Sequence, residues 1–128
     1  MTIDINTYLA KQYPQPPCWF LVADVYHTEF DQPVELFKTV NASVRAIASA
    51  FRIAIHKNPN GFHQVAEPVE GCIVLLGRNA AIGIHHCGVF TDGRVLHMLA
   101  SGGYFEELSV IRDQYALVEF WSKAGQGA

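Results

Sequence analysis

Residues 85–98 read HHCGVFTDGRVLHM, and this stretch decides the predicted fold. Two short apolar runs flank Asp92-Gly93, the dipeptide that most readily adopts the two positive φ angles of a type I′ turn. The sequence therefore predicts a β-hairpin with Asp92-Gly93 as its loop. The resulting register pairs Thr91 with Arg94, Phe90 with Val95, Gly88 with His97, and His86 with Leu99.

The two histidines of this hairpin are expected to share one face of the sheet. Side chains alternate along a strand, so His86 and Gly88 point to the same side as His97. His86 and His97 are then diagonal neighbours, with backbones about 7–8 Å apart. Gly88, opposite His97, has no side chain to separate the two rings. Paired imidazoles on one sheet face indicate a reactive site, and such a site requires a nucleophile.

Length and composition predict one globular domain over residues 1–128. Half of the 128 residues are hydrophobic and only 16% are charged, which is enough apolar material for a substantial core. The net charge is −3 and the nine basic residues are scattered, so no nucleic-acid partner is predicted. No apolar run reaches the roughly 20 residues of a membrane span. Residues 1–17 hold no apolar core of a signal peptide, so a cytoplasmic location is expected, unless another carrier delivers the protein.

Three cysteines remain to be explained, Cys18, Cys72 and Cys87. Their odd number and wide spacing argue against a disulfide framework. Three prolines precede Cys18 and predict an extended approach. Apolar residues then recur with helical spacing, which predicts a helix from Cys18 to about Thr28. A thiol in the first turn of a helix has its pKa lowered by the helix dipole, so Cys18 is the candidate nucleophile; the plain alternative is a small buried side chain.

The other expected elements form a scaffold around these two features. A short helix is expected within residues 2–13, and a long amphipathic helix is expected to begin at Asp31-Gln32-Pro33 and to end near residue 57. Residues 62–70 are expected to be irregular, residues 72–76 to form a central strand, and residues 115–121 to form the last strand. The segment between these strands is expected to turn at residues 101–103, with 106–112 helical or irregular. Residues 125–128 are expected to be a frayed tail.

The remaining histidines and cysteines have simpler interpretations. In the predicted register His85 points away from His97, so it is assigned to structure or solvent, although a loop of odd length would exchange it with His86. Cys87 is assigned to the core. His56 and His63 are expected to be solvated. A metal site built from Cys72, His85, His86, Cys87 and His97 was considered, but no Cys-x-x-Cys or His-Glu-x-x-His spacing supports it, so neither a metal nor another cofactor is predicted.

Four short segments of the chain resemble, in the same order, motifs of the NlpC-type cell-wall cysteine peptidases of the papain-like superfamily. The Cys-x-x-Leu-Val helix start of that family is similar to CWFLV at residues 18–22. Its Gly-Asp-(Ile/Leu)-Val strand is similar to GCIV at 71–74, and its His-Val-Gly-Ile-Tyr strand to HCGVF at 86–90. Its next strand, ending in aliphatic-His, is similar to VLHM at 95–98. The resemblance spans roughly residues 13–122, and its Cys-Trp start resembles the phage tail branch; Pro17 and Cys72 stand where the family usually has Asp.

The resemblance implies an α+β fold in which N-terminal helices pack on a small antiparallel sheet or half-open barrel. It implies a cysteine peptidase with Cys18 as nucleophile, His86 as general base and His97 as the residue that orients His86. Tyr13 and Trp19 are expected to line the substrate site. The expected substrate is the stem peptide of bacterial peptidoglycan, and other phage tail proteins are the expected partners, with the protein reaching the cell wall in a virion.

Two alternatives to this interpretation stay open. The first is a structural phage tail component on the same fold with reduced or lost activity, since fold does not imply function. The second is a cytosolic papain-like amidase or acyltransferase that acts on small molecules.

Overall fold

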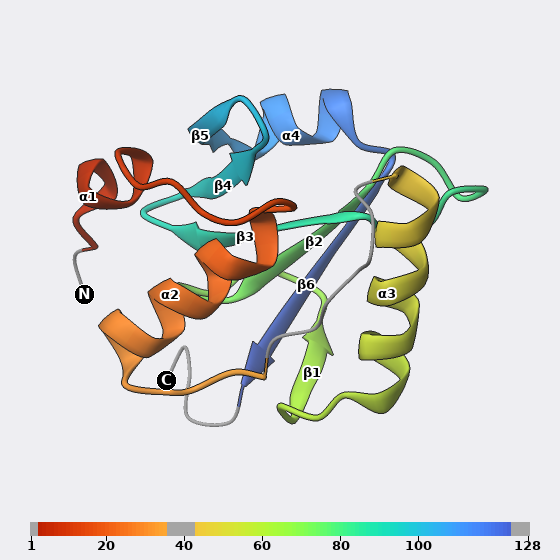
Figure 1. Ribbon diagram of the computed structural model, residues 1–128, viewed down its shortest axis with the longest axis horizontal. Helices are drawn as coiled ribbons and strands as arrows, with labels where there is room; N and C mark the ends of the chain where they lie inside the picture. Colours follow the sequence, from red (N-terminus) through yellow and green to blue (C-terminus); the bar gives the residue numbers. More distant parts are fainter. Residues whose placement is uncertain (1–2, 36–42, 124–128) are drawn as a thin grey trace.

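The computed structural model describes residues 3–35 and 43–123. Four helices and six strands occur in these residues (Figure 1). In chain order they are α1 (Ile5–Leu9), α2 (Cys18–Phe30), α3 (Val44–Lys57), β1 (Phe62–Val65), β2 (Ile73–Gly77), β3 (His86–Thr91), β4 (Arg94–Leu99), β5 (Gly102–Glu107), α4 (Leu108–Gln114) and β6 (Leu117–Lys123). None of the helices within the described residues has the length and apolar content needed to cross a bilayer.

The six strands form one antiparallel sheet in the order β1-β6-β2-β3-β4-β5. The sheet stays open at β1 and β5 and does not close into a barrel. The predicted α+β class with an antiparallel sheet is therefore confirmed. As predicted, β2 lies at the centre of the sheet, and each of its five residues is buried.

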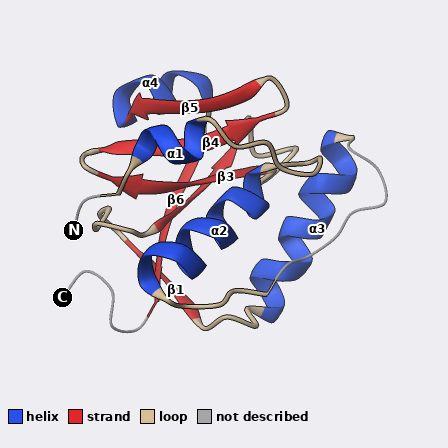
Figure 2. Cartoon of the chain, turned by 60° about the vertical axis from the view of Figure 1, so that its left-hand side comes forward, coloured by secondary structure: helices blue, strands red, loops and turns tan. Residues whose placement is uncertain are grey.

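Helices cover both faces of the sheet (Figure 2). On one face, α1, α2 and α3 enclose the larger core, to which α2 contributes the fully buried Leu21, Val22 and Val25. On the other face, Ile111 of α4 packs into a smaller core with Leu76 and neighbouring strand residues. Each fully buried aliphatic side chain of these cores stabilises the fold by about 1.5–3 kcal/mol, so α2 is held firmly against β3 and β4.

The predicted hairpin is confirmed in loop and register. Asp92 and Gly93 have φ angles of 51° and 76°, which is the conformation of a type I′ turn. Gly88 pairs with His97, and Thr91 pairs with Arg94. The hairpin thus forms β3 and β4, two of the four strands that lie between the edges of the sheet.

The predicted start of the long helix at residues 31–33 is wrong. Residues 33–35 are not helical, and Asp31 instead ends α2 in the left-handed conformation, with φ 51°. The next described helix, α3, is capped by Ser43, whose side chain accepts a hydrogen bond from the N–H of Ala46 at 3.2 Å. Residues 36–42 of the predicted helix and the predicted tail at 125–128 lie outside the described residues.

Two edge strands were not predicted. Residues 62–65, expected to be irregular, form β1 and pair with β6. Residues 102–107, expected to be a turn followed by a helical or irregular segment, form β5 and pair with β4. Both are short, and β5 also carries two glycines and two glutamates; such sequences become strands when a neighbouring strand supplies hydrogen bonds.

Candidate functional site

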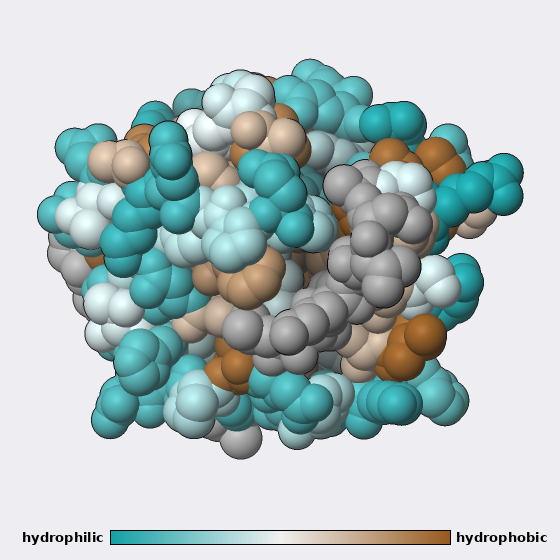
Figure 3. Space-filling model, in the orientation of Figure 1, coloured by the Kyte–Doolittle hydropathy of each residue, from teal (hydrophilic) through white to brown (hydrophobic). Residues whose placement is uncertain are grey.

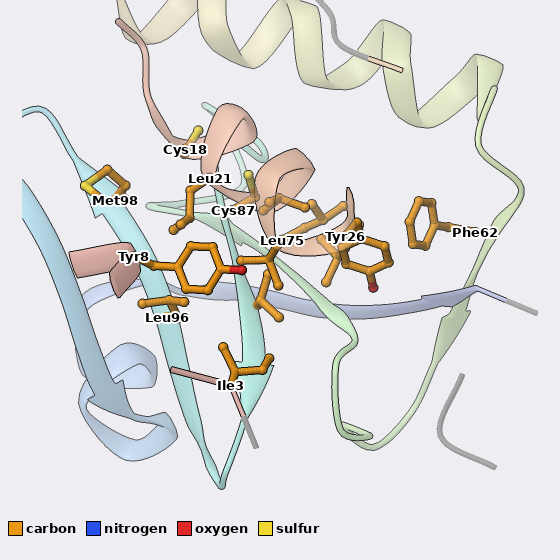
Figure 4. Close-up of a cluster of buried hydrophobic side chains, with 14 of the residues drawn as sticks. Ile3, Tyr8, Cys18, Leu21, Tyr26, Phe62, Leu75, Cys87, Leu96 and Met98 are labelled. Atoms are coloured by element: carbon orange, nitrogen blue, oxygen red, sulfur yellow. The ribbon is translucent and has the colours of Figure 1, made fainter. Parts of the chain in front are cut away.

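Cys18 is the first residue of α2, which confirms its predicted place in the first turn. Pro17 is the N-cap residue and makes no side-chain cap hydrogen bond, so the unpaired N–H groups of the first turn leave the positive end of the helix dipole at Cys18. The Cys18 residue is only 4% exposed. Its sulfur lies in the larger core together with Cys87 of β3 (Figure 4).

The pKa of the Cys18 thiol is held well below its ordinary value. The main cause is a hydrogen bond from the Cys87 thiol; the hydrogen bond and positive charge of His86 add to it and outweigh the effect of burial. Burial and the neighbouring Cys18 sulfur raise the pKa of Cys87 well above its ordinary value. The Cys87 thiol therefore stays protonated and donates a hydrogen bond to the Cys18 thiolate. Cys87 is buried, as predicted, and it also contacts the candidate nucleophile.

His86 and His97 are in direct contact. Nε2 of His86 lies 2.9 Å from Nδ1 of His97, and the two rings meet edge to face with centroids 5.1 Å apart. His97 is fully buried and His86 is nearly so. Because Nε2 of His86 is taken up by His97, Nδ1 is the ring nitrogen that is left for Cys18. The structure thus brings together the three residues that the sequence placed in the site.

Sequence reasoning missed a carboxylate at the far end of this chain of contacts. Oε1 of Glu106 lies 2.7 Å from Nε2 of His97. Burial and the charge of His86 lower the pKa of His97, against the opposing effect of Glu106. His97 is therefore a neutral ring between two partners. Glu106 is on β5, where it pairs with Val95 of β4. The alternation of Tyr104 and Glu106 is typical of a strand and could have placed Glu106 in the sheet, but this segment was not predicted to be a strand.

A tyrosine that the sequence analysis left without a role also contacts the site. The ring of Tyr115, which follows α4, stacks on His86 with centroids 5.8 Å apart and planes 22° apart. The ring of Tyr104 lies 5.7 Å from His97 on the other side. These rings restrict the rotation of both imidazoles, which favours a fixed site geometry.

His85 lies outside the histidine pair, in agreement with its predicted structural role. Its Nε2 accepts a hydrogen bond from the N–H of Arg78 at 3.1 Å, and burial lowers its pKa. It therefore orders the loop between β2 and β3 as a neutral side chain. His56 and His63 are exposed.

The two residues expected to line the substrate site take different positions. The Tyr13 hydroxyl donates to Asp24 on α2 at 2.6 Å, so it ties the segment before α2 to that helix. Trp19 donates its indole N–H to the backbone oxygen of Glu35 at 2.9 Å. Trp19 also forms part of the wall of a cavity of about 340 Å³. A role of Tyr13 or Trp19 in substrate binding stays a prediction.

This cavity, which we call the α3 cavity, lies between α3 and the sheet. Its walls are mostly apolar and include Trp19, Phe51, Ile55, Phe62, Leu75 and Trp121. Hydrophobic side chains also reach the surface on the side of α3 in Figure 3, where Ile53 is 53% exposed. Trp19 follows Cys18 in the chain, whereas Cys18 itself does not line the α3 cavity.

Within residues 3–35 and 43–123, no three His, Cys, Asp or Glu side chains are grouped so that they could hold a metal ion.

Comparison of the chain with known protein families, with curated proteins and with solved structures finds no match. The site geometry and the sequence motifs are therefore the grounds for a functional proposal.

The thiol of Cys18 should lose its proton at a lower pH than the thiols of Cys72 and Cys87, because its pKa is lowered and theirs are raised. Burial raises the pKa of Cys72 to about 11 and the pKa of Cys87 is also raised, so only Cys18 should form a thiolate well below the ordinary cysteine pKa of about 8.5. Thiolate absorbance in the ultraviolet, followed against pH, should show this early step. Replacing Cys87 by alanine should move the step to higher pH, because the main donor to the Cys18 sulfur is lost. Cys72→Ala is the control and should leave it in place; an early step that disappears with Cys72→Ala would contradict the assignment.

Proposed function

We propose that the protein is a cysteine peptidase or amidase of the NlpC-type papain-like class that hydrolyses peptide bonds in the stem peptides of bacterial peptidoglycan. The observation that carries the proposal is the pair of His86 and His97, whose ring nitrogens lie 2.9 Å apart, beside a Cys18 thiol at a helix start whose pKa His86 helps to lower. A thiol, a base and a residue that orients the base are the parts that nucleophilic acyl transfer requires.

The proposed reaction proceeds through a thioester. The Cys18 thiolate attacks the carbonyl carbon of the scissile amide, and the developing oxyanion accepts a hydrogen bond from the Cys18 N–H at the start of α2. Nδ1–H of His86 then protonates the leaving amine as the C–N bond breaks. In the second half, His86 accepts a proton from water, the hydroxide adds to the thioester, and the thiolate leaves with release of a carboxylic acid.

The cell-wall substrate rests on the sequence motifs. The helix that opens with Cys-Trp, the His-x-Gly strand and the following aliphatic-His strand resemble the phage tail branch of the NlpC-type peptidases. The arrangement of a Cys-led helix packed on an antiparallel sheet supports this proposal. Delivery with other phage tail proteins in a virion is part of the same proposal.

A second candidate function is favoured by the α3 cavity. Peptidoglycan stem peptides are rich in carboxylate and amino groups, whereas the wall of the α3 cavity is mostly apolar. An amidase or acyltransferase that acts on small molecules with an apolar acyl group would use such a cavity to bind that group.

Cleavage assays test the proposal and separate the two candidates. Purified peptidoglycan, γ-D-glutamyl stem peptides and medium-chain N-acyl amino acids are incubated with the wild type and with Cys18→Ala, and released amines are quantified by mass spectrometry. The proposed function predicts release from the peptidoglycan substrates by the wild type alone. Release from the N-acyl amino acids alone would establish the second candidate. Equal release by the wild type and Cys18→Ala would overturn both.

A further inference from the structure

Glu106 is the carboxylate at the end of the line of contacts that starts at Cys18. Its side chain is 24% exposed, whereas the His97 side chain that it contacts is not exposed at all. We propose that Glu106 is a positioning residue that sets the tautomers of both imidazoles and so directs Nδ1 of His86 to the Cys18 sulfur. The inference deepens the proposed function and rests on Cys18 being the nucleophile.

The donor and acceptor roles follow from the carboxylate. An ionised carboxylate only accepts hydrogen bonds, so Nε2 of His97 carries a proton that it donates to Glu106 over 2.7 Å. His97 is neutral, because burial and the charge of His86 lower its pKa. Its Nδ1 therefore presents a lone pair. Nε2 of His86 must then donate to that lone pair over 2.9 Å.

The consequence for His86 is that its Nδ1 is free to exchange a proton with Cys18. Had His97 carried its proton on Nδ1, that proton would point at His86 Nε2 and force the His86 proton onto Nδ1. Neutral His86 could then no longer accept a proton from the thiol. Glu106 excludes this arrangement and also supplies a negative charge that stabilises the protonated His86 through the shared ring.

Other ionisable side chains surround the two rings, but within the described residues only Glu106 contacts the outer nitrogen of His97. Tyr104 and Tyr115 stack against the rings. The charges of His86 and Arg78 lower the pKa of His85, and the charge of Arg78 also acts on Tyr115. Glu107, the next residue on β5, is exposed and lies 3.8 Å from Arg94, so it offers a matched control with the same charge.

The first test uses the unmodified protein. The nitrogen chemical shifts of the His97 imidazole, measured by NMR at neutral pH, report which of its ring nitrogens carries the proton, because burial and the charge of His86 hold the pKa of His97 below its ordinary value. We expect a protonated Nε2 and an unprotonated Nδ1 in His97. A proton on Nδ1 of His97 in the wild type would overturn the proposal.

The second test compares Glu106→Gln with Glu107→Gln. Glutamine can both donate and accept, so Glu106→Gln should leave His97 as a mixture of tautomers and raise the pKa of the Cys18 thiol in the ultraviolet titration. We expect kcat to fall about 100-fold, less than the roughly 10⁴-fold loss when a triad carboxylate next to the base is made neutral, because Glu106 acts through one more ring. Glu107→Gln should behave as the wild type. Glu106→Asp keeps the charge and should restore part of the loss.

The outcomes separate the role of Glu106 from the choice of substrate. If Glu106→Gln folds and leaves the His97 tautomer and the Cys18 titration unchanged, Glu106 is not a positioning residue. If Glu106→Gln unfolds, the wild-type tautomers and the Glu106→Asp titration decide the question. If no peptidoglycan substrate is cut but the Cys18 titration depends on Glu106, the proposed substrate fails and the positioning role stands.

Discussion

Replacing His86 by alanine should reduce kcat/KM by about 10⁴-fold, the upper range for loss of a general acid–base group. His86 is the only imidazole that contacts both the Cys18 sulfur and His97 within the described residues. Without it, the thiol loses a hydrogen-bond donor and a positive charge, so its thiolate fraction at neutral pH falls. The leaving amine also loses its proton donor. Steady-state kinetics on the substrate that the wild type cleaves best measures this loss.

A double variant sharpens this prediction. Residues that act as one unit lose function together, so the variant with both Cys18→Ala and His86→Ala should be no less active than Cys18→Ala alone. His85→Gln is the matched control, because glutamine can still accept the hydrogen bond from the N–H of Arg78. It should keep most of the activity. A larger loss with His85→Gln than with His86→Ala would show that His86 is not the general base.

Replacing Gly88 by alanine should lower the free energy of unfolding by about 3 kcal/mol, the upper range for overpacking a well-packed interior. A Cβ atom at position 88 would lie 2.6 Å from the backbone oxygen of Leu96 and 3.0 Å from Cβ of His97. The backbone of β4 cannot retreat, because it is bonded to β5 on its other side. Urea unfolding followed by circular dichroism measures the change.

The control for Gly88 is the hairpin turn. Gly93 also has a conformation that side chains rarely adopt, with φ 76°, but nothing lies within 4 Å of a Cβ atom there. Asparagine tolerates this conformation, so Gly93→Asn should cost less than about 1 kcal/mol. Equal losses for Gly88→Ala and Gly93→Asn would show that the close approach of the two strands is not what Gly88 provides. If Gly88→Ala still folds, the displacement of His97 should also reduce the activity of the variant.

Local patterns predicted the features that depend on a few neighbouring residues. Asp92-Gly93 has the turn conformation that its residue types favour, and the hairpin register follows from it. The prolines before Cys18 and the apolar spacing after it placed the start of α2 at the observed residue. Where two local signals competed, the prediction failed: Pro33 resembled a helix start, whereas Asp31 ends α2 and the next described helix begins after Ser43.

The sequence by itself determined the hairpin, the helix that Cys18 opens, and the pairing of His86 with His97, because turn chemistry and side-chain alternation act within one or two elements. Only the tertiary structure decided that Glu106 contacts His97 and that Cys87 donates to Cys18. Both depend on long-range placement: β5 becomes a strand only by pairing with β4, and α2 reaches β3 only through the shared core. No local pattern carries that information, since these contacts join segments whose own sequences favour other structures or none.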